Sequence, residues 1–195
     1  RPEALNRLLA DTWALAKHTA EDPDSGPPEG APQASGEARN LFDESIGKLD
    51  TDRKLEIATA CEDAALSADP RLSNSEGASC DTDSGRKLYA DSRGFRGEYR
   101  FSSVSVSVSP IAQSGGKMQI DSWWSAARSL KDLEDPKSVG LTAAKRTLRK
   151  LGARPVKTCK VPVVFDPSTA GQLLGALCGA VNGGALSSPC ASCLP

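Results

Sequence analysis

A long alternation of serine and valine constrains the fold of this chain more than any other feature. Across residues 97–112, which read GEYRFSSVSVSVSPIA, Val104, Val106 and Val108 alternate with small polar serines. A period of two places the valines on one face of a β-strand and the serines on the other. We therefore predict a long strand whose valine face packs on a core.

The serine face of this strand has two interpretations. Ser103, Ser105 and Ser107 carry small side chains that would leave the sheet surface shallow. An extended peptide could lie along such a surface, and an ordinary solvated sheet face would show the same residues. The sequence leaves both interpretations open.

The two ends of the strand are less regular than its middle. Tyr99 and Phe101 fall in the serine phase. Either the start of the strand is covered on both faces, or a bulge near Ser102 shifts the register. Pro110 has no backbone N–H, so we expect the strand to stop pairing there or to lie at an edge of the sheet.

Apolar residues at helical spacing predict four helices, over residues 2–17, 52–68, 136–151 and 168–181. Asp135-Pro136 and Asp166-Pro167 each place a carboxylate cap before a proline, which starts the last two helices. The buried face of the second helix is predicted to contain Leu55, Ala58, Cys61, Ala65 and Ala68. That of the third helix is predicted to contain Leu141, Ala144, Leu148 and Leu151. Residues 21–40 are rich in Pro, Gly and Ser and predict an extended surface loop.

The remaining strands predict an antiparallel arrangement. Turn residues between 71 and 90 flank short strand candidates near Leu72 and Leu88, and Ser114-Gly115-Gly116 returns the long strand into residues 117–124. The run Val161–Phe165 is too apolar for a surface strand and is expected to be a central one. The predicted fold class is α+β, with an antiparallel β-meander packed against amphipathic helices.

Glycine recurs at every fourth residue of the last predicted helix, at Gly171, Gly175 and Gly179. Each glycine costs a helix about 1 kcal/mol relative to alanine, so a stripe of them indicates that another backbone passes close by. We predict a contact between domains or subunits there, and we expect Gly140 in the preceding helix to be less crowded. The apolar run is shorter than the ~20 residues that a membrane-spanning helix needs.

Charge and composition exclude several kinds of partner. The net charge is −1, and Lys and Arg are spread along the chain, so we expect neither nucleic acid nor an anionic membrane surface as a partner. Residues 1–20 do not resemble a signal peptide, which favours the cytoplasm. In that reducing compartment the six cysteines are expected to be thiols, with Cys61 and Cys178 buried.

Few residues suggest catalysis. His18 is the one histidine of the chain and is expected to lie on the surface. No nucleophile elbow, P-loop or dinucleotide-binding motif occurs. Cys190 and Cys193 have the spacing of half a zinc site or of a redox pair, without a second pair suitably spaced.

Four segments in order resemble the TldD/PmbA family, and within it the PmbA (TldE) branch. They are residues 68–79, 90–108, 118–154 and 161–186, which include ADPRLSNSEGAS, ADSRGFRGEYRFSSVSVSV and VPVVFDPSTAGQLLGALCGAVNGGAL. The resemblance implies a cytoplasmic heterodimer whose zinc lies in a TldD-like partner, on a helix that carries His-Glu-x-x-x-His. When the helices are aligned through Leu173-Leu174, the two ligand positions hold Gly175 and Ala180, and the general-base position holds Ala176. None of these three side chains can perform zinc chemistry.

The resemblance also implies a division of the chain. Residues 1–157 would be the central α+β domain, and residues 158–195 the truncated start of a second, β-rich C-terminal domain. Members of the family are roughly twice as long as this chain, so we expect a fragment or a truncated gene.

The sequence therefore predicts the metal-free subunit, or a piece of it, of a TldD/PmbA-type metallopeptidase complex that cleaves unfolded or small peptides. An alternative is a stand-alone peptide-binding module that uses the serine face of the long strand for β-addition. A third hypothesis is a small zinc or thiol-redox protein built on Cys190 and Cys193.

Overall fold

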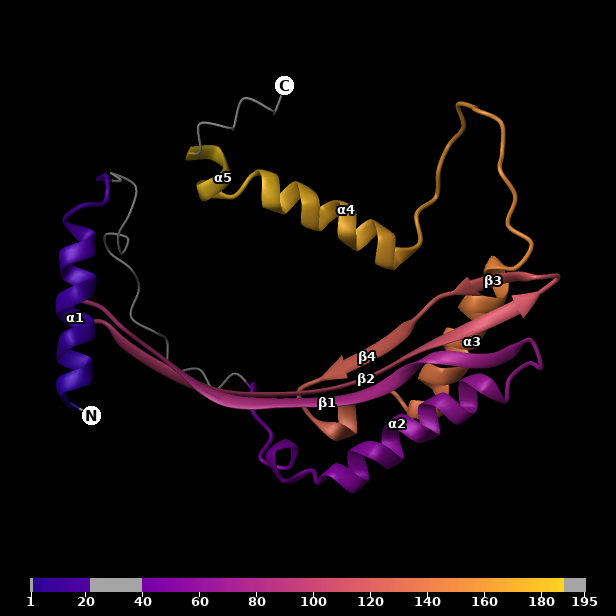
Figure 1. Cartoon of the computed structure of the whole chain (residues 1–195), viewed down its shortest axis with the longest axis horizontal. Helices are drawn as coiled ribbons and strands as arrows, with labels where there is room; N and C mark the ends of the chain where they lie inside the picture. The colour runs from indigo at the N-terminus through magenta and orange to yellow at the C-terminus, as the bar shows by residue number, and fades with distance from the viewer. Residues whose placement is uncertain (1, 22–39, 188–195) are drawn as a thin grey trace. The chain divides into compact units, whose positions relative to one another are not determined.

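The computed structural model describes residues 2–21 and 40–187. They fall in two compact units, one spanning Pro32–Lys157 and the other formed from the two ends of the chain, 1–31 and 158–195. The elements in chain order are α1 (Pro2–Ala16), η1 (Ile46–Lys48), α2 (Thr51–Leu66), β1 (Leu72–Ala90), β2 (Arg96–Ser114), β3 (Lys117–Ile120), β4 (Trp123–Ala127), η2 (Leu130–Asp132), α3 (Pro136–Lys150), α4 (Pro167–Ala180) and α5 (Gly183–Ser187). Helices and an antiparallel sheet together confirm the predicted α+β class (Figure 1).

The serine-valine strand β2 lies in the middle of the sheet. It pairs antiparallel with β1 on one side, and on the other side with β3 and β4, which follow each other along it. Gly115 and Gly116 join β2 to β3 with φ angles of 58° and 76°, as a two-residue turn with two positive φ angles requires. The predicted antiparallel meander is confirmed (Figure 1).

Pro110 neither ends β2 nor lies at an edge of the sheet, so that expectation was wrong. On one side, the register of β1 shifts between Ser75 and Ala78, next to the residue that faces Pro110. On the other side, the chain leaves the ladder between β3 and β4, across residues 121–122. Because both neighbouring strands are irregular at this point, the sheet tolerates a residue without a backbone donor.

β1 is one continuous strand, where the sequence predicted short strands separated by turns. Asp83, Ser84 and Gly85 pair in register with Ser103, Ser102 and Phe101 of β2. Pairing with a long partner strand overrides the turn preference of these residues, because strand propensity depends strongly on context.

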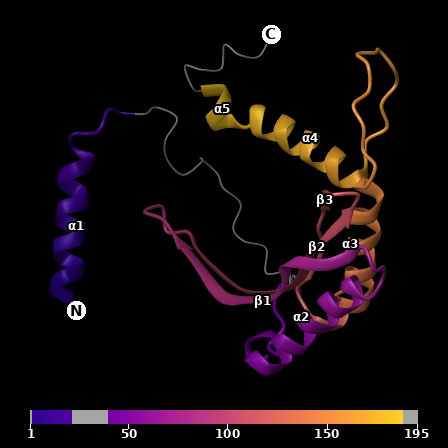
Figure 2. The same cartoon turned by 45° about the vertical axis from the view of Figure 1, so that its right-hand side comes forward.

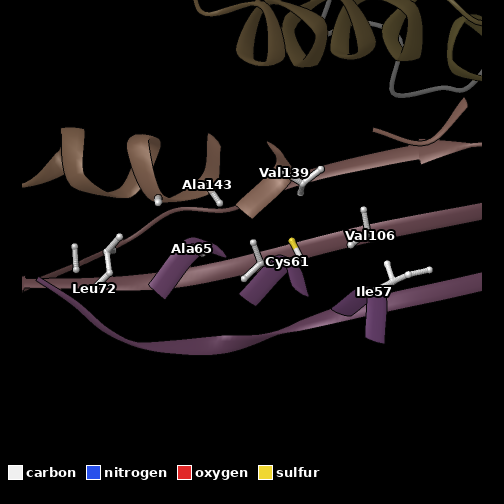
Figure 3. Packing of buried hydrophobic residues seen from close by; sticks show 10 residues of the cluster. Ile57, Cys61, Ala65, Leu72, Val106, Val139 and Ala143 are labelled. Carbon is white, nitrogen blue, oxygen red and sulfur yellow. The ribbon is translucent and has the colours of Figure 1, made fainter. Parts of the chain in front are cut away.

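The valine face of β2 packs against α2 and α3, as predicted. The buried residues of this core are Ile57, Cys61 and Ala65 from α2, Leu72 from β1, Val106, Val108 and Ala112 from β2, and Val139, Ala143 and Ala144 from α3. Figure 3 shows the side chains of α2 and α3 meeting those of the sheet in this layer. The core therefore has two layers, one of helices and one of strands.

The predicted faces of the two core helices were partly wrong. On α2, Ile57 is buried with Cys61 and Ala65, whereas Leu55 is 59% exposed. Leu55 precedes Cys61 by six positions, which turns it about 120° around the helix. On α3, Leu141 is 53% exposed because the helix turns its smaller residues toward α2.

Gly140 is the glycine at which two helices approach most closely. A Cβ at this position would lie 2.2 Å from the carbonyl oxygen of Cys61 and 3.1 Å from the nitrogen of Ala65. The expectation that Gly140 is less crowded than Gly175 was therefore wrong. The absence of a side chain at Gly140 lets α3 lie directly against the backbone of α2.

In the unit formed by the two chain ends, the residues that the structure describes are exposed or half-buried. Asp166 caps α4 as predicted, because its side chain accepts from the backbone N–H of Ser168. Val161–Phe165 is not a strand, contrary to prediction, and no strand within residues 2–21 and 40–187 pairs with it. Cys178 is exposed rather than buried, and His18 is exposed as expected. No helix in the described part of the chain is long and apolar enough to cross a membrane.

Candidate functional site: an open sheet face and a glycine helix

Ser103, Ser105 and Ser107 lie on the face of the sheet opposite α2 and α3. Opposed residues of an antiparallel pair point to the same face, so the partners of these serines share it. Those partners are Asp83, Asp81 and Ser79. The hydroxyl of Ser79 lies 3.1 Å from that of Ser107 and donates to the carboxylate of Asp81 at 2.9 Å. This part of the face is therefore polar and acidic.

Apolar side chains line the other margin of the same face. Trp124 is opposite Ser107 in the register, and Ile120 is opposite Ile111. Trp124 is 63% exposed, Ile120 40% and the neighbouring Met118 64%. Exposed apolar residues that gather on one face are typical of a surface that contacts another molecule.

The backbone of β2 limits how a peptide can use this face. Ser105 pairs with Asp81 on one side and Ala126 on the other, and Ser107 is likewise paired on both sides. β-Addition to this part of β2, as in the alternative hypothesis, is therefore blocked. A peptide on this face would meet side chains, and strand addition would require an outer edge of the sheet, either that of β1 or that of β3 and β4.

Tyr99 and Phe101 follow neither of the two predicted arrangements. The register runs without a shift from Ala90↔Arg96 to Ala78↔Val108, so there is no bulge near Ser102. The strand's start is not covered on both faces either, because residues 98–100 are exposed on both. The hairpin simply extends beyond its helical cover, and Tyr99 and Phe101 contact each other with ring centroids 6.5 Å apart.

A polar clamp that sequence reasoning missed holds the segment before α2 against the sheet. Ser102 is fully buried in the valine phase; its N–H donates to the carbonyl of Leu41, and its hydroxyl accepts from the N–H of Asp43. Ser129 and Ser45 donate to the carboxylate of Asp43. The hydroxyl of Ser129, followed by the donors of Ser45, lowers the pKa of Asp43 to about 2. A polar residue in an otherwise apolar phase was the signal that could have revealed this clamp.

The glycine stripe of α4 meets nothing within the part of the chain that the structure describes. A Cβ at Gly171, Gly175 or Gly179 would have no heavy atom of another segment within 4 Å. Leu173 and Leu174, on other sides of the helix, are 51% and 63% exposed. A helix that is apolar on most sides is normally buried. A role of the stripe in an interface remains a prediction.

Gly175, Ala176 and Ala180 all lie on α4, at the positions that the family resemblance assigns to the zinc ligands and the general base. Their side chains carry no donor atom for a metal. Within residues 2–21 and 40–187, no three His, Cys, Asp or Glu residues form a group that could hold a metal ion. Cys190 and Cys193 lie outside the described residues.

One family model and several known proteins are similar to this chain. Residues 44–151 match the model of the PmbA/TldA metallopeptidase central domain. Metalloprotease PmbA of Escherichia coli O157:H7 is 34% identical over 185 residues, which cover 95% of this chain and 41% of that protein. The metalloprotease PmbA homolog of Haemophilus influenzae is 31% identical over 183 residues, covering 94% of this chain and 40% of the homolog.

A solved structure supports the fold. TldE from Thermococcus kodakarensis superposes with a TM-score of 0.59 at 13% identity, covering 76% of this chain and 33% of that one. At this identity the likeness shows the fold alone. This chain spans about two fifths of the length of the curated relatives that it matches.

Proposed function

This chain belongs to the PmbA/TldA metallopeptidase family, whose central domain it contains, and we propose that it is the metal-free subunit, or a piece of it, of a TldD/PmbA-type peptidase complex. The complex would act in the cytoplasm on unfolded or small peptides. Zinc and the catalytic groups would come from a TldD-like partner that carries His-Glu-x-x-x-His. This chain would position the partner and contribute surface for the peptide.

The side chains of α4 carry this proposal. Zinc in peptidases is held by nitrogen, oxygen or sulfur ligands, and the attack on the peptide needs a base. Gly175, Ala176 and Ala180 supply none of these groups. The function that remains for α4 is packing, for which glycine and alanine are suited because they allow close approach.

A reconstitution experiment tests whether the zinc and the catalytic groups belong to the partner subunit. Cleavage of a denatured test peptide would be measured for the full-length protein containing this chain, for the His-Glu-x-x-x-His partner, and for the mixture. We expect chelator-sensitive cleavage that requires the partner, and no stoichiometric zinc in this chain alone. Chelator-sensitive cleavage by this chain alone would overturn the proposal. One equivalent of zinc that is lost when Cys190 and Cys193 are changed to serine would support the zinc-protein hypothesis instead.

We further propose that the glycine stripe of α4 contacts the partner subunit. Gly175→Leu would place a branched side chain in that contact, and overpacking typically costs about 1–3 kcal/mol, which corresponds to a roughly 5- to 150-fold loss of affinity. Ala170→Leu is the matched control, since it places a leucine side chain on α4 about 140° around the helix from Gly175. Unchanged affinity of the Gly175→Leu variant would show that the stripe does not contact the partner.

The open sheet face supports a second candidate role, which is peptide binding through Ser103, Ser105, Ser107 and the exposed Trp124. Trp124→Ser removes a large exposed apolar surface at the margin of this face. We expect the variant to raise the KM of the complex for an extended peptide. Trp13→Ser is the control, because Trp13 is also exposed but lies on α1. Equal effects of the two substitutions would contradict a specific role of this face.

A further inference from the structure

Two arginines lie directly opposite each other on the paired strands of the hairpin. Arg86 of β1 is the register partner of Arg100 of β2. Both fall in the phase of Ser102 and Val104, so they share the face that carries the core, beyond the point where α2 covers it. Like charges directly opposite each other destabilise a strand pair. Glu98 lies 3.8 Å from Arg86, and an anion bound between the two guanidinium groups would offset the repulsion further.

The two arginines form part of the wall of a pocket. The pocket has a volume of about 660 Å³ and lies between the hairpin and the segment around η1, which contributes Phe42, Glu44 and Lys48. This volume is within the range of about 300–1,000 Å³ that is typical of small-molecule and cofactor sites. The pocket lies entirely within the unit Pro32–Lys157.

The charges of the pocket do not cancel. Lys48 pairs with Glu44 at 3.2 Å, and Arg86 lies 3.8 Å from Glu98 in a pair whose side chains are largely exposed. Exposed ion pairs of this kind contribute little stabilising free energy. Arg100 has no carboxylate partner within residues 2–21 and 40–187. The wall thus carries three cations and one carboxylate, with Glu98 beside it.

Arg100 is oriented for recognition of a planar anion. The carbon at the centre of its guanidinium lies 3.6 Å from the centroid of the Phe42 ring, so the ring covers one face of the group. Stacking leaves the N–H edges of a guanidinium available, and two parallel N–H groups match the two oxygens of a carboxylate. The Phe42 ring thereby holds the guanidinium group of Arg100 in place, while Arg86 supplies a second cation beside it.

The wall that carries Phe42 is itself fixed to the sheet. Asp43, next to Phe42, donates its N–H to the buried hydroxyl of Ser102 at 2.8 Å and accepts from Ser129 and Ser45. This clamp fixes the wall that carries Phe42 before a ligand arrives. Such preorganisation reduces the entropy that binding costs.

We propose that this pocket binds a carboxylate group of a peptide through Arg100 and Arg86. That the carboxylate belongs to a peptide rests on the proposed function, whereas recognition of a carboxylate rests on the pocket alone. Two sources share this chemistry, the C-terminal carboxylate of a peptide and the side chain of aspartate or glutamate. The pocket would then favour one end or one acidic residue of a peptide.

Three fluorescent peptides built on one parent sequence distinguish these sources. The first has a free C-terminal carboxylate and no acidic side chain, the second is its C-terminal amide, and the third is an amide with one internal glutamate. Binding to the full-length protein is measured by anisotropy at low and at physiological salt. We expect the amide without glutamate to bind most weakly, and the stronger of the other two to identify the source.

Substitutions in the pocket test whether it is the binding site. Arg100→Gln and Arg86→Gln should each weaken binding of the carboxylate peptide by roughly 10-fold or more, the usual range for a hydrogen bond to a charged group. Arg100→Lys should also weaken it, because lysine keeps the charge but not the planar fork. Arg96→Gln is the matched control, since it removes the same charge from the same strand and phase and does not line the pocket.

The outcomes are distinct. Equal binding of all three peptides, or an equal loss in Arg96→Gln and Arg100→Gln, overturns the proposal in favour of unspecific attraction. Binding that inorganic phosphate abolishes while acetate has no effect overturns the assignment to a carboxylate. Because binding is measured without cleavage, a failed reconstitution of peptidase activity leaves this result intact, and a failed binding test leaves the cleavage result intact.

Discussion

Substitution of Gly140 by alanine should destabilise the protein, although the same change usually stabilises a helix. Alanine is the better helix former by about 1 kcal/mol, so an uncrowded position would gain that amount. At Gly140 the new Cβ would lie 2.2 Å from the carbonyl oxygen of Cys61. Favourable contacts between such atoms begin near 3.5 Å, so α2 and α3 must separate locally by roughly 1 Å.

The size of the effect follows from these opposing terms. One extra methyl group in a tightly packed core costs typically about 1–3 kcal/mol, and a clash with backbone cannot be relieved by a rotamer change. Because the backbone itself must move, the cost lies in the upper part of this range, about 2–3 kcal/mol, and subtracting the gain of about 1 kcal/mol in helix propensity leaves a net loss of about 1–2 kcal/mol. For a domain of this size the melting temperature should fall by roughly 3–10 °C.

Thermal unfolding followed by circular dichroism measures this prediction. Gly175→Ala is the matched control, because a Cβ at Gly175 meets no other segment of the described chain within 4 Å. We expect the control to leave the melting temperature unchanged or to raise it. If Gly140→Ala raises the melting temperature, then α2 and α3 do not cross as closely as the structure shows, and the reasoning is refuted.

Two further predictions concern titratable groups. Because the pKa of Asp43 is lowered from 3.8 to about 2 by Ser129 and Ser45, its ionised form stabilises the fold above pH 3.8, and this contribution is lost as the pH falls toward 2. Asp43→Asn should therefore lower the melting temperature at pH 7 and converge with the parent protein near pH 2; a constant difference across this range would contradict the prediction. Burial raises the pKa of Cys61 to about 11, so alkylation mapped by mass spectrometry at pH 8 should modify exposed Cys178 well before Cys61, and equal rates would contradict the buried site.

The parts of the fold that depend on local pattern could be read from the sequence. The alternation around Val104, Val106 and Val108 needs only its own period of two to define a buried face, and the structure buries all three. Asp135 and Asp166 cap their helices because capping involves only a few neighbouring residues. These features carry their information within a single segment.

The parts that depend on a second segment could not be read in this way. The closeness of Gly140 to Cys61 arises where two helices cross. Glycine has no side chain whose polarity or size would predict such a contact from the sequence. The pocket requires Arg86 and Arg100 to be in register, and a segment some 40 residues earlier to lie beside them. Val161–Phe165 does not form a strand, because a strand needs a neighbouring strand that pairs with its backbone, and none of the strands in the described part of the chain does so.

The hairpin formed by β1 and β2 reaches past its helical support, and its two halves should open at different free energies. Figure 2 shows the paired strands extending beyond α2 toward their connecting turn. A two-stranded ribbon exposed on both faces is only marginally stable in water. Amide hydrogens of residues 96–100 should therefore exchange with solvent through local opening, whereas those of residues 104–108 should exchange only through global unfolding. Strand β2 is thus rigid from residue 104 onward, and its first residues can separate from β1 without global unfolding. The buried hydroxyl of Ser102 lies at the boundary between these two parts.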